Sequence, residues 1–566
     1  MSRALLLRQT CLVALLSSGI LTLPAGSIAQ TSSPSHGTHG GGVDMQGPAP
    51  LWQGTGSISF PITTSSPDAQ KYFDQGLRFA YGFNHGEAQR SFRQAQSLDP
   101  SCAMCYWGEA LVLGPNINAP MSADAIKPAV AALRKAQELA DEASPKEQGL
   151  IGALAARYVE DPASDRKALD QAYAEVMEAL AQRYPDDLNI AVLAAEAAMD
   201  TQPWDYWQAG GKEPKGRMAG AIRLLENAIA QDPNHYGAIH LYIHTVEASD
   251  NPRRAEPHAD RMATFDLAGL GHLVHMPSHI YFRIGRYRDS VETNQRAVEA
   301  DEAYLRQRGE PGFYGAMYYP HNVHFVLASA QMTGDRTAAL SAADKLASLI
   351  PDDTARAMPM VEPIKAAPYG AYAIYADSDT VLGLPEPPAD LPVVRAMWHH
   401  ARGNALAAKG DLAGARAEAE AIERIADTTD FTPMKEAGIP GAEIVQIAGE
   451  VLLGRIAQHA GEADAAIDHF EEAAAIEDEI PYMEPPYWYY PVRQSLGAAL
   501  LQAGRPAEAE AAFQEALRKA PGSGWIIYGL SEAQKANNDQ AGSEATRSRL
   551  NDVWVGDMAL LDLSRL

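Results

Sequence analysis

The residues of this chain best suited to chemistry are histidines, and most of them are concentrated between residues 235 and 324. Two groups of ligating residues have helical spacing, the first being His240, His244 and Glu247, and the second His272, His275 and His279. Each group places its side chains about one helical turn apart. Imidazoles together with a carboxylate suit zinc, copper or iron, and no thiolate is needed. The spacing therefore predicts a transition-metal site carried by two helices.

Two later histidines, His321 and His324, extend the candidate ligand set. Because one ion takes three or four protein ligands, some members of this set must instead act as hydrogen-bonded supports or contact another ligand. The chain lacks the His-Glu-x-x-His motif of zinc proteases, so no known hydrolase is indicated. The alternative interpretation is a polar, metal-free groove in which histidines hydrogen-bond to one another or to neighbouring loops.

Cys102 and Cys105 form a second chemical motif, at a predicted helix start that follows Asp99 and Pro100. A thiolate there would be stabilised by the helix N-terminus, which leaves a redox role open. The next residue is Tyr106 and not histidine, so covalent haem attachment is not supported. The preferred interpretation is a local disulfide between Cys102 and Cys105 in an oxidising compartment.

The elements that must position these residues are Ala-rich helical segments in which one pattern of small and apolar residues recurs. Its clearest instances are Gly76, Phe79, Ala88, Phe92, Ala95 and Pro100, and then Leu496, Gly497, Leu500, Ala509, Phe513, Ala516 and Pro521. The pattern resembles the 34-residue tetratricopeptide repeat. Strings such as HMPSHIY and EPPYWYYPVR also look like bacterial exported members of that superfamily. The resemblance implies an all-α, right-handed superhelical solenoid of about ten helix hairpins.

The repeat register gathers the histidines on one helix face. Position 5 holds His240, His275, His324 and His400, position 9 holds His244 and His279, position 2 holds His272 and His321, and position 12 holds Glu247. These positions form a stripe about 80° wide, opposite the face that packs within a hairpin. In the tetratricopeptide superfamily this stripe lines the concave groove where ligands bind, so the resemblance implies a groove site here. Chance would place about 1.6 histidines on the stripe, far fewer than occur.

Charge and the N-terminus limit the other functions. The chain has 72 acidic and 46 basic residues and a net charge of −26, which argues against a nucleic-acid partner. Arg3 and Arg8 precede an apolar run and small residues ending at Ala29, as in a secretory signal. No later stretch reaches the roughly 18 apolar residues of a membrane span, so no integral membrane segment is expected. We therefore expect a periplasmic or secreted protein.

The chain divides into five predicted segments. They are a signal peptide at 1–29, a flexible Ser/Gly/His-containing lead at 30–66, an N-terminal repeat array with the histidines at 67–350, a Pro-rich insertion at 351–392, and a C-terminal array at 393–566. Further insertions are expected at 204–215 and 304–319, and loops added to one face of a solenoid often lie on its binding face. The aromatic run at 487–490 either packs between repeats or floors a pocket.

These features predict an exported repeat protein whose groove binds a transition metal, together with a small ligand, a peptide or a protein partner. A metal-dependent periplasmic enzyme that uses Glu247 as a ligand or general base is the first alternative. A metal-free scaffold that binds a peptide or protein is the second. The Lys/Asn carboxylate clamp usual in tetratricopeptide proteins is not evident at the groove positions.

Overall fold

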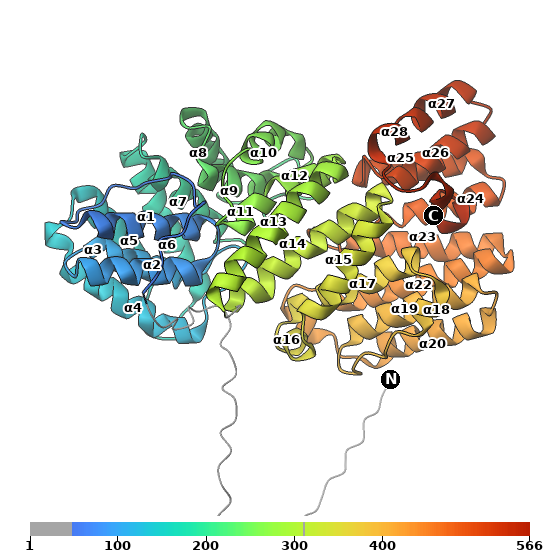
Figure 1. Cartoon of the computed structure of the whole chain (residues 1–566), viewed down its shortest axis with the longest axis horizontal. Coiled ribbons are helices and arrows are strands. Elements are labelled where there is room, and N and C mark those ends of the chain that lie inside the picture. Colours follow the sequence, from blue (N-terminus) through green and yellow to red (C-terminus); the bar gives the residue numbers. More distant parts are fainter. Residues whose placement is uncertain (1–47, 310–311) are drawn as a thin grey trace, which may run out of the picture. The chain divides into compact units, whose positions relative to one another are not determined.

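The computed structural model describes residues 48–309 and 312–566, and the regular elements in these residues are helices, with no β-strand (Figure 1). The predicted all-α fold is confirmed. The helices up to the break are α1 (Pro67–Tyr81), α2 (His85–Leu98), α3 (Ala103–Val112), α4 (Ala123–Glu138), α5 (Pro145–Ala155), α6 (Arg166–Arg183), α7 (Leu188–Met199), α8 (Met218–Gln231), α9 (Tyr236–Val246), α10 (Glu256–Met262), α11 (Gly271–His275), α12 (Pro277–Ile284) and α13 (Tyr287–Arg308).

The later helices continue the same pattern to the C-terminus. They are α14 (Gly312–Thr333), α15 (Arg336–Leu349), α16 (Asp352–Ala357), α17 (Glu362–Tyr375), α18 (Ser378–Leu382), α19 (Pro392–Ala408), α20 (Leu412–Thr428), α21 (Thr432–Glu436), α22 (Gly441–Ala460), α23 (Ala463–Glu479), α24 (Arg493–Gln502), α25 (Pro506–Lys519), α26 (Gly524–Ala536), α27 (Gln540–Ser548) and α28 (Leu550–Val553). None of the described helices has both the length and the apolar composition that crossing a membrane requires.

Helices that follow one another in the chain pack as hairpins, such as α1 with α2, α22 with α23 and α24 with α25 (Figure 1). The glycines of the recurring pattern make this close packing possible. A Cβ atom added to Gly76 would lie 2.7 Å from the ring of Phe92, closer than any real Cβ contact. The same contact recurs between Gly454 and Phe470, and between Gly497 and Phe513. The small-residue pattern therefore marks helix hairpins, as predicted.

The histidines between residues 272 and 279 lie on two short helices that are separated next to a proline. The register analysis treats residues 272–279 as one helix. In the structure α11 ends at His275 and α12 begins at Pro277, with Met276 between them. Proline lacks the N–H that would continue the hydrogen bonding of α11. The break leaves His272 and His275 on one helix and His279 on the next.

The prediction of a flexible lead is wrong for the part of it that the structure describes, residues 48–66. The backbone N–H of Phe60 donates to Asp74 at 3.0 Å, and the Phe60 ring is buried. Trp52 donates its indole N–H to Glu87 at 2.9 Å. Hydrogen bonds and a few buried apolar residues thus hold this extended segment against α1 and α2. Residues 30–47 and the predicted signal at 1–29 lie outside the described residues.

The stretch 351–392, predicted as a Pro-rich insertion, also needs correction. It contains α17, which packs against both α15 and α19 and so continues the stack. Pro363 occupies the first turn of α17, where a missing N–H breaks no helical hydrogen bond. The expected insertion at 304–319 is likewise largely helical, because α13 extends to Arg308 and α14 begins at Gly312.

Cys102 and Cys105 are joined by a disulfide at the start of α3, and both residues are buried. The only other cysteine, Cys11, lies in the predicted signal. We expect thiol labelling of the exported protein under denaturing, non-reducing conditions to detect no free thiol, and to detect two after reduction. Two labelled thiols before reduction would contradict the pairing.

Candidate metal centre

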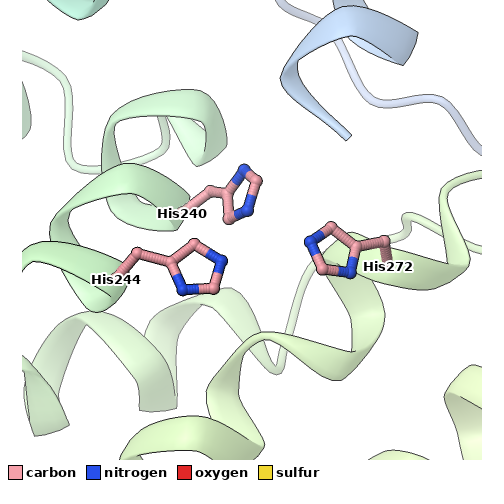
Figure 2. A group of neighbouring side chains, drawn as sticks. All are labelled: His240, His244 and His272. Atoms are coloured by element: carbon pink, nitrogen blue, oxygen red, sulfur yellow. The ribbon is translucent and has the colours of Figure 1, made fainter. Parts of the chain in front are cut away.

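Three buried histidines converge from two helices. His240 and His244 lie one turn apart on α9, and His272 faces them from α11 (Figure 2). One ring nitrogen from each residue lies within 4.8 Å of the other two, and each residue is at most 2% exposed. We call these residues the tri-histidine set. Three imidazoles at this spacing match the protein ligand number of a zinc-type site with one open position.

Hydrogen bonds orient two of these rings. Nδ1–H of His240 donates to the carbonyl of Tyr81 at 2.7 Å, and Nδ1–H of His244 donates to Glu247 Oε1 at 2.8 Å. Among the residues that the structure describes, the Nε2 atoms of both histidines have no hydrogen-bond partner, and neither ring nitrogen of His272 has one. Buried polar atoms without a partner are rare and unfavourable in folded proteins. A cation bound among these nitrogens would satisfy them, with Tyr81 and Glu247 supporting the ligands.

Burial also keeps the rings of the tri-histidine set neutral. Burial is the largest effect on each of the three rings, and it lowers their pKa values below the ordinary range of histidine. The neighbouring histidines lower the values further, because two imidazolium ions repel each other. A neutral imidazole is the form that binds a metal ion, so no proton must first be removed near neutral pH.

Aromatic side chains pack against all three rings of the tri-histidine set. The ring of Phe83 lies 4.5 Å from that of His240 and 5.6 Å from that of His272, between centroids. Trp204, from the predicted insertion, lies 5.2 Å from His244. Phe83 and Trp204 both have positive φ angles, of 54° and 64°. A backbone conformation this uncommon is retained where the surroundings hold it, and it often marks a functional site.

A second group lies beside the first and consists of His275, His279 and His321, which we call the second histidine set. One ring nitrogen from each again lies within 4.8 Å of the others. Nε2 of His275 and Nε2 of His279 are 2.6 Å apart, and Nδ1–H of His275 donates to Asn294 Oδ1 at 2.5 Å. His321 comes from α14, so three helices contribute to this group.

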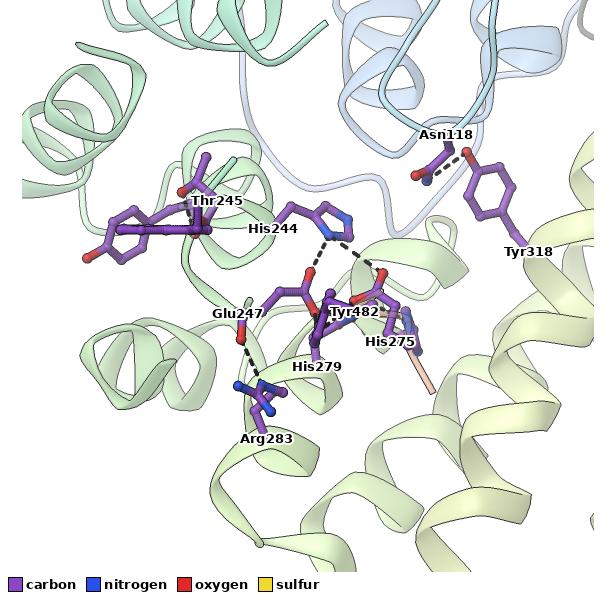
Figure 3. A network of polar contacts seen from close by, with 12 residues as sticks. Asn118, His244, Thr245, Glu247, His275, His279, Arg283, Tyr318 and Tyr482 are labelled. Carbon is purple, nitrogen blue, oxygen red and sulfur yellow. Dashed lines mark hydrogen bonds and ion pairs between the residues drawn. The ribbon is translucent and has the colours of Figure 1, made fainter. Parts of the chain in front are cut away.

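Two carboxylates lie between the sets. Glu247 accepts from His244 through Oε1 and from Nδ1–H of His279 through Oε2, the latter at 2.9 Å (Figure 3). Glu484 Oε2 accepts from the same Nδ1–H at 2.6 Å. The hydroxyl of Tyr482 donates to Glu247 Oε2 at 2.7 Å. Glu247 thus orients one histidine of each set.

This carboxylate pair controls the charge between the sets. Burial opposes protonation of His279, but Glu247 and Glu484 outweigh it and raise its pKa to about 10. Burial, together with the nearby charge of Glu247, raises the pKa of Glu484 well above its usual range. Burial also disfavours ionisation of Glu247, yet His279 and the surrounding hydrogen bonds hold its pKa well below the usual range. In the metal-free protein these shifts favour an ionised Glu247, a protonated Glu484 and a cationic His279.

The structure brings together most of the predicted ligands, with one exception. His324 belongs to none of the three metal-compatible groups in the described residues, and its nearest aromatic neighbour is Tyr489, at 6.0 Å between ring centroids. His400, which shares its register position, donates Nδ1–H to the carbonyl of Ala448 at 2.8 Å, in a different part of the stack. Position in the repeat alone therefore does not place a histidine at the centre.

Sequence reasoning missed Glu484, Tyr482 and Phe83. The first two lie in the segment between α23 and α24, about two hundred residues beyond His279 in the chain. Glu484 begins the string EPPYWYYPVR, which stands out by its aromatic and proline content, but nothing in its spacing relates it to the histidines. No spacing rule relates a residue on this segment to α9 or α12, because tertiary packing alone brings them together.

The centre borders a cavity of about 1390 Å³. Its wall includes His244 and His272 of the tri-histidine set and His321 of the second histidine set. Glu484 and His324 also line it. Tyr487 and Tyr489 of the aromatic run line the same space, so this run contributes to a pocket. A ligand in the cavity would reach both histidine sets without crossing the core.

The C-terminal helices allow the repeat type to be identified. The family model described as tetratricopeptide repeat matches residues 500–551, which span α25, α26 and α27. The chain contains tetratricopeptide repeats. Gly497 and Phe513 make one of the close hairpin contacts. Phe513 lies within the matched region, and Gly497 lies three residues before it. Repeats of this kind stack into extended surfaces suited to protein or peptide binding.

Two solved tetratricopeptide structures can be aligned with most of the chain. Human IFIT1, solved as a dimer with PPP-AAAA, aligns over 86% of this chain and 91% of its own, at 12% identity and a TM-score of 0.32. Yeast Tom70 aligns over 84% of this chain and 90% of its own, at 12% identity and a TM-score of 0.26. No curated protein matches the sequence. At these scores neither structure supports an argument about ligands, and the site must be judged on its own geometry.

A buried aspartate joins three helices of this tetratricopeptide protein next to the tri-histidine set. Asp301 on α13 accepts from the hydroxyl of Tyr314 at 2.8 Å and from the side-chain amide of Asn322 at 2.7 Å, both on α14. The same Tyr314 hydroxyl accepts the backbone N–H of His272 at 2.9 Å, near the start of α11. Burial raises the pKa of Asp301 to about 7.

This raised pKa predicts a pH-dependent stability. The folded protein binds the Asp301 proton more tightly than the unfolded chain does, so the stabilisation is present at low pH and is lost as pH rises through about 7. Between pH 5 and pH 8 the unsubstituted protein should lose about 2 to 3 kcal/mol of its free energy of unfolding through Asp301, and Asp301→Asn should not show this loss. Asn322 Oδ1 has no partner, so Asn322 can flip to accept from the new amide. Urea unfolding of both proteins at the two pH values tests this, and equal pH dependence would contradict it.

Proposed function

We propose that the chain is an exported tetratricopeptide-repeat binding protein in which the tri-histidine set holds one transition-metal ion. The observation that carries the proposal is the convergence of three buried imidazoles whose facing nitrogens lack hydrogen-bond partners. Imidazole-only ligation suits zinc, copper, iron or nickel, and it disfavours calcium and magnesium, which prefer oxygen ligands.

The hydrogen bonds around the set support the same proposal. The carbonyl of Tyr81 and the carboxylate of Glu247 accept from the ring nitrogens that point away from the centre. Metal-bound histidines commonly donate their second N–H in this way, which fixes the tautomer and makes the ligand more basic. A groove built only for polar packing would gain from hydrogen bonds on both ring nitrogens, and His272 has none on either.

Elemental analysis of protein purified without a histidine tag tests the proposal. We expect at least one equivalent of zinc, copper or iron per chain, either as isolated or after loading a chelator-treated sample and removing free metal. Substoichiometric metal in both samples would leave the metal-free scaffold as the function.

The mature N-terminus, determined on exported protein, should follow Ala29; retention of residues 1–29 in the mature protein would contradict export by a cleaved signal.

A metal-dependent enzyme is the second candidate, and Glu484 favours it. This carboxyl lies on the cavity wall, and burial together with the charge of Glu247 raises its pKa, which favours the protonated form. A proton-holding carboxyl beside an ion with an open position is an arrangement that general acid–base catalysis uses. Glu484→Gln would separate the two candidates, because an enzyme should lose turnover while metal content stays unchanged.

A further inference from the structure

We propose that His275, His279 and His321 hold a second transition-metal ion, so that the centre is dinuclear. The inference rests on the proposed function, because it adds a site beside the ion of the tri-histidine set. Each set supplies three imidazoles, two of them four residues apart in the chain and the third from elsewhere. Each therefore has the ligand number of a site with an open position.

To bind an ion, the second histidine set needs a small ring rotation and the release of one ring proton from His279. Two nitrogens bound to one tetrahedral ion at about 2.0–2.1 Å are about 3.3 Å apart. Nε2 of His275 and Nε2 of His279 now lie 2.6 Å apart, so a rotation of either ring would open the space. His321 faces both rings, with centroids 4.8 Å and 5.8 Å away. Nδ1–H of His275 is held by Asn294, which leaves Nε2 as the ligand atom.

The two sets lie side by side and share a support. The ring centroids of His244 and His279 are 5.0 Å apart, and those of His272 and His275 are 5.7 Å apart. Glu247 accepts from Nδ1–H of His244 and of His279, so one carboxylate orients a ligand of each set (Figure 3). Nε2 of His244 has no partner in the described residues and Nε2 of His279 now lies against Nε2 of His275, so the two can face separate ions once His279 gives up its second ring proton.

The remaining metal-compatible group is better explained as this support than as a third site. It consists of His244, Glu247, His279 and Glu484. Its contacts of 2.6 to 2.9 Å between Nδ1 and carboxylate oxygens are ordinary lengths for charge-assisted hydrogen bonds. They are shorter than the separation of two ligands on one ion. Hydrogen bonding through Nδ1 is also what leaves Nε2 for the two histidine sets.

Metal loading of the untagged chain tests for two ions. The background carries His36→Ala and His39→Ala, which remove the two histidines of the lead. His321→Leu removes a ligand of the second set, and His272→Leu removes a ligand of the first. His324→Leu is the matched control, because His324 is buried with both ring nitrogens unpartnered but belongs to neither set. Circular dichroism checks folding, and His321→Asn replaces His321→Leu if the latter does not fold.

Zn²⁺ is the probe for stoichiometry and Cu²⁺ the probe for proximity. We expect two Zn²⁺ per chain in the background protein and in His324→Leu, and one in His321→Leu and in His272→Leu. The electron paramagnetic resonance signal of the fully Cu²⁺-loaded background protein should integrate to less than its copper content, because adjacent Cu²⁺ ions couple. In Cu²⁺-loaded His321→Leu the integrated signal should equal the copper content.

Each other outcome overturns the proposal in a different way. One Zn²⁺ per chain that is lost in His272→Leu and kept in His321→Leu would leave the proposed function standing and remove the second ion. Two Zn²⁺ with a full-intensity copper signal would mean two separate sites and no dinuclear centre. No bound Zn²⁺ in the background protein would remove the proposed function and the second ion together.

Discussion

His272→Leu should lower the affinity of the tri-histidine set for Zn²⁺ by more than about 100-fold, while the metal-free protein stays at least as stable as the unsubstituted protein. Loss of an outer hydrogen-bonded support typically lowers metal affinity 10- to 100-fold, and loss of a ligand should exceed that. The two ring nitrogens of His272 have no partner in residues 48–309 and 312–566, so leucine removes two buried unpartnered polar atoms and creates none. Competition with a chelating Zn²⁺ indicator measures the affinity, and urea unfolding with chelator present measures the stability.

His324→Leu makes this a test of ligation and not of burial. Its ring nitrogens are also buried and unpartnered, and it borders the same cavity, but it lies outside the tri-histidine set. Its removal should leave Zn²⁺ affinity within about twofold of the starting value. Equal losses of affinity in His272→Leu and His324→Leu would mean that the histidines act through packing, and the metal proposal would fail.

Arg157→Met should destabilise the fold by about 3 to 5 kcal/mol at pH 8, the usual effect of removing one partner of a buried ion pair. Arg157 is 2% exposed. It donates through Nη2 to Asp200 at 2.6 Å and through Nε to Asp170 at 2.9 Å. Methionine fills most of the space but leaves Asp200 buried without its cation. Thermal or urea unfolding of the two proteins gives the difference.

A second substitution and a change of pH separate charge from packing. Asp200→Leu added to Arg157→Met should recover most of the loss, because Asp170 keeps Arg166 as a partner at 3.2 Å. Burial already raises the pKa of Asp200 to about 6 although Arg157 lowers it, so without Arg157 this carboxyl stays protonated to higher pH. The destabilisation should therefore be smaller at pH 5 than at pH 8. A loss that is equal at both pH values and persists in the double variant would indicate a packing defect.

The hairpin architecture could be predicted because its causes are local. A glycine and a phenylalanine at fixed offsets, as in Gly76 and Phe92, determine how closely two consecutive helices approach. Proline effects are equally local, and Pro277 separates α11 from α12 within a stretch that the repeat register treats as one helix. The same local logic misjudged 48–66 and 351–392, because the order in those stretches comes from contacts with distant helices, such as Trp52 with Glu87.

The sequence by itself determined which histidines share a helix face, because a helical repeat converts spacing directly into direction. Tertiary structure decided which of them meet. The stacking of separate hairpins brings Phe83 and Trp204 against the histidine rings and places Glu484 beside His279. It also sets how α11 and α12 lie on either side of Met276. His324 has the register of His240 and His275 yet belongs to neither set, although His321, three residues earlier on the same α14, belongs to the second. Register gives the direction of a side chain, whereas the distance between two side chains follows from packing over the whole chain.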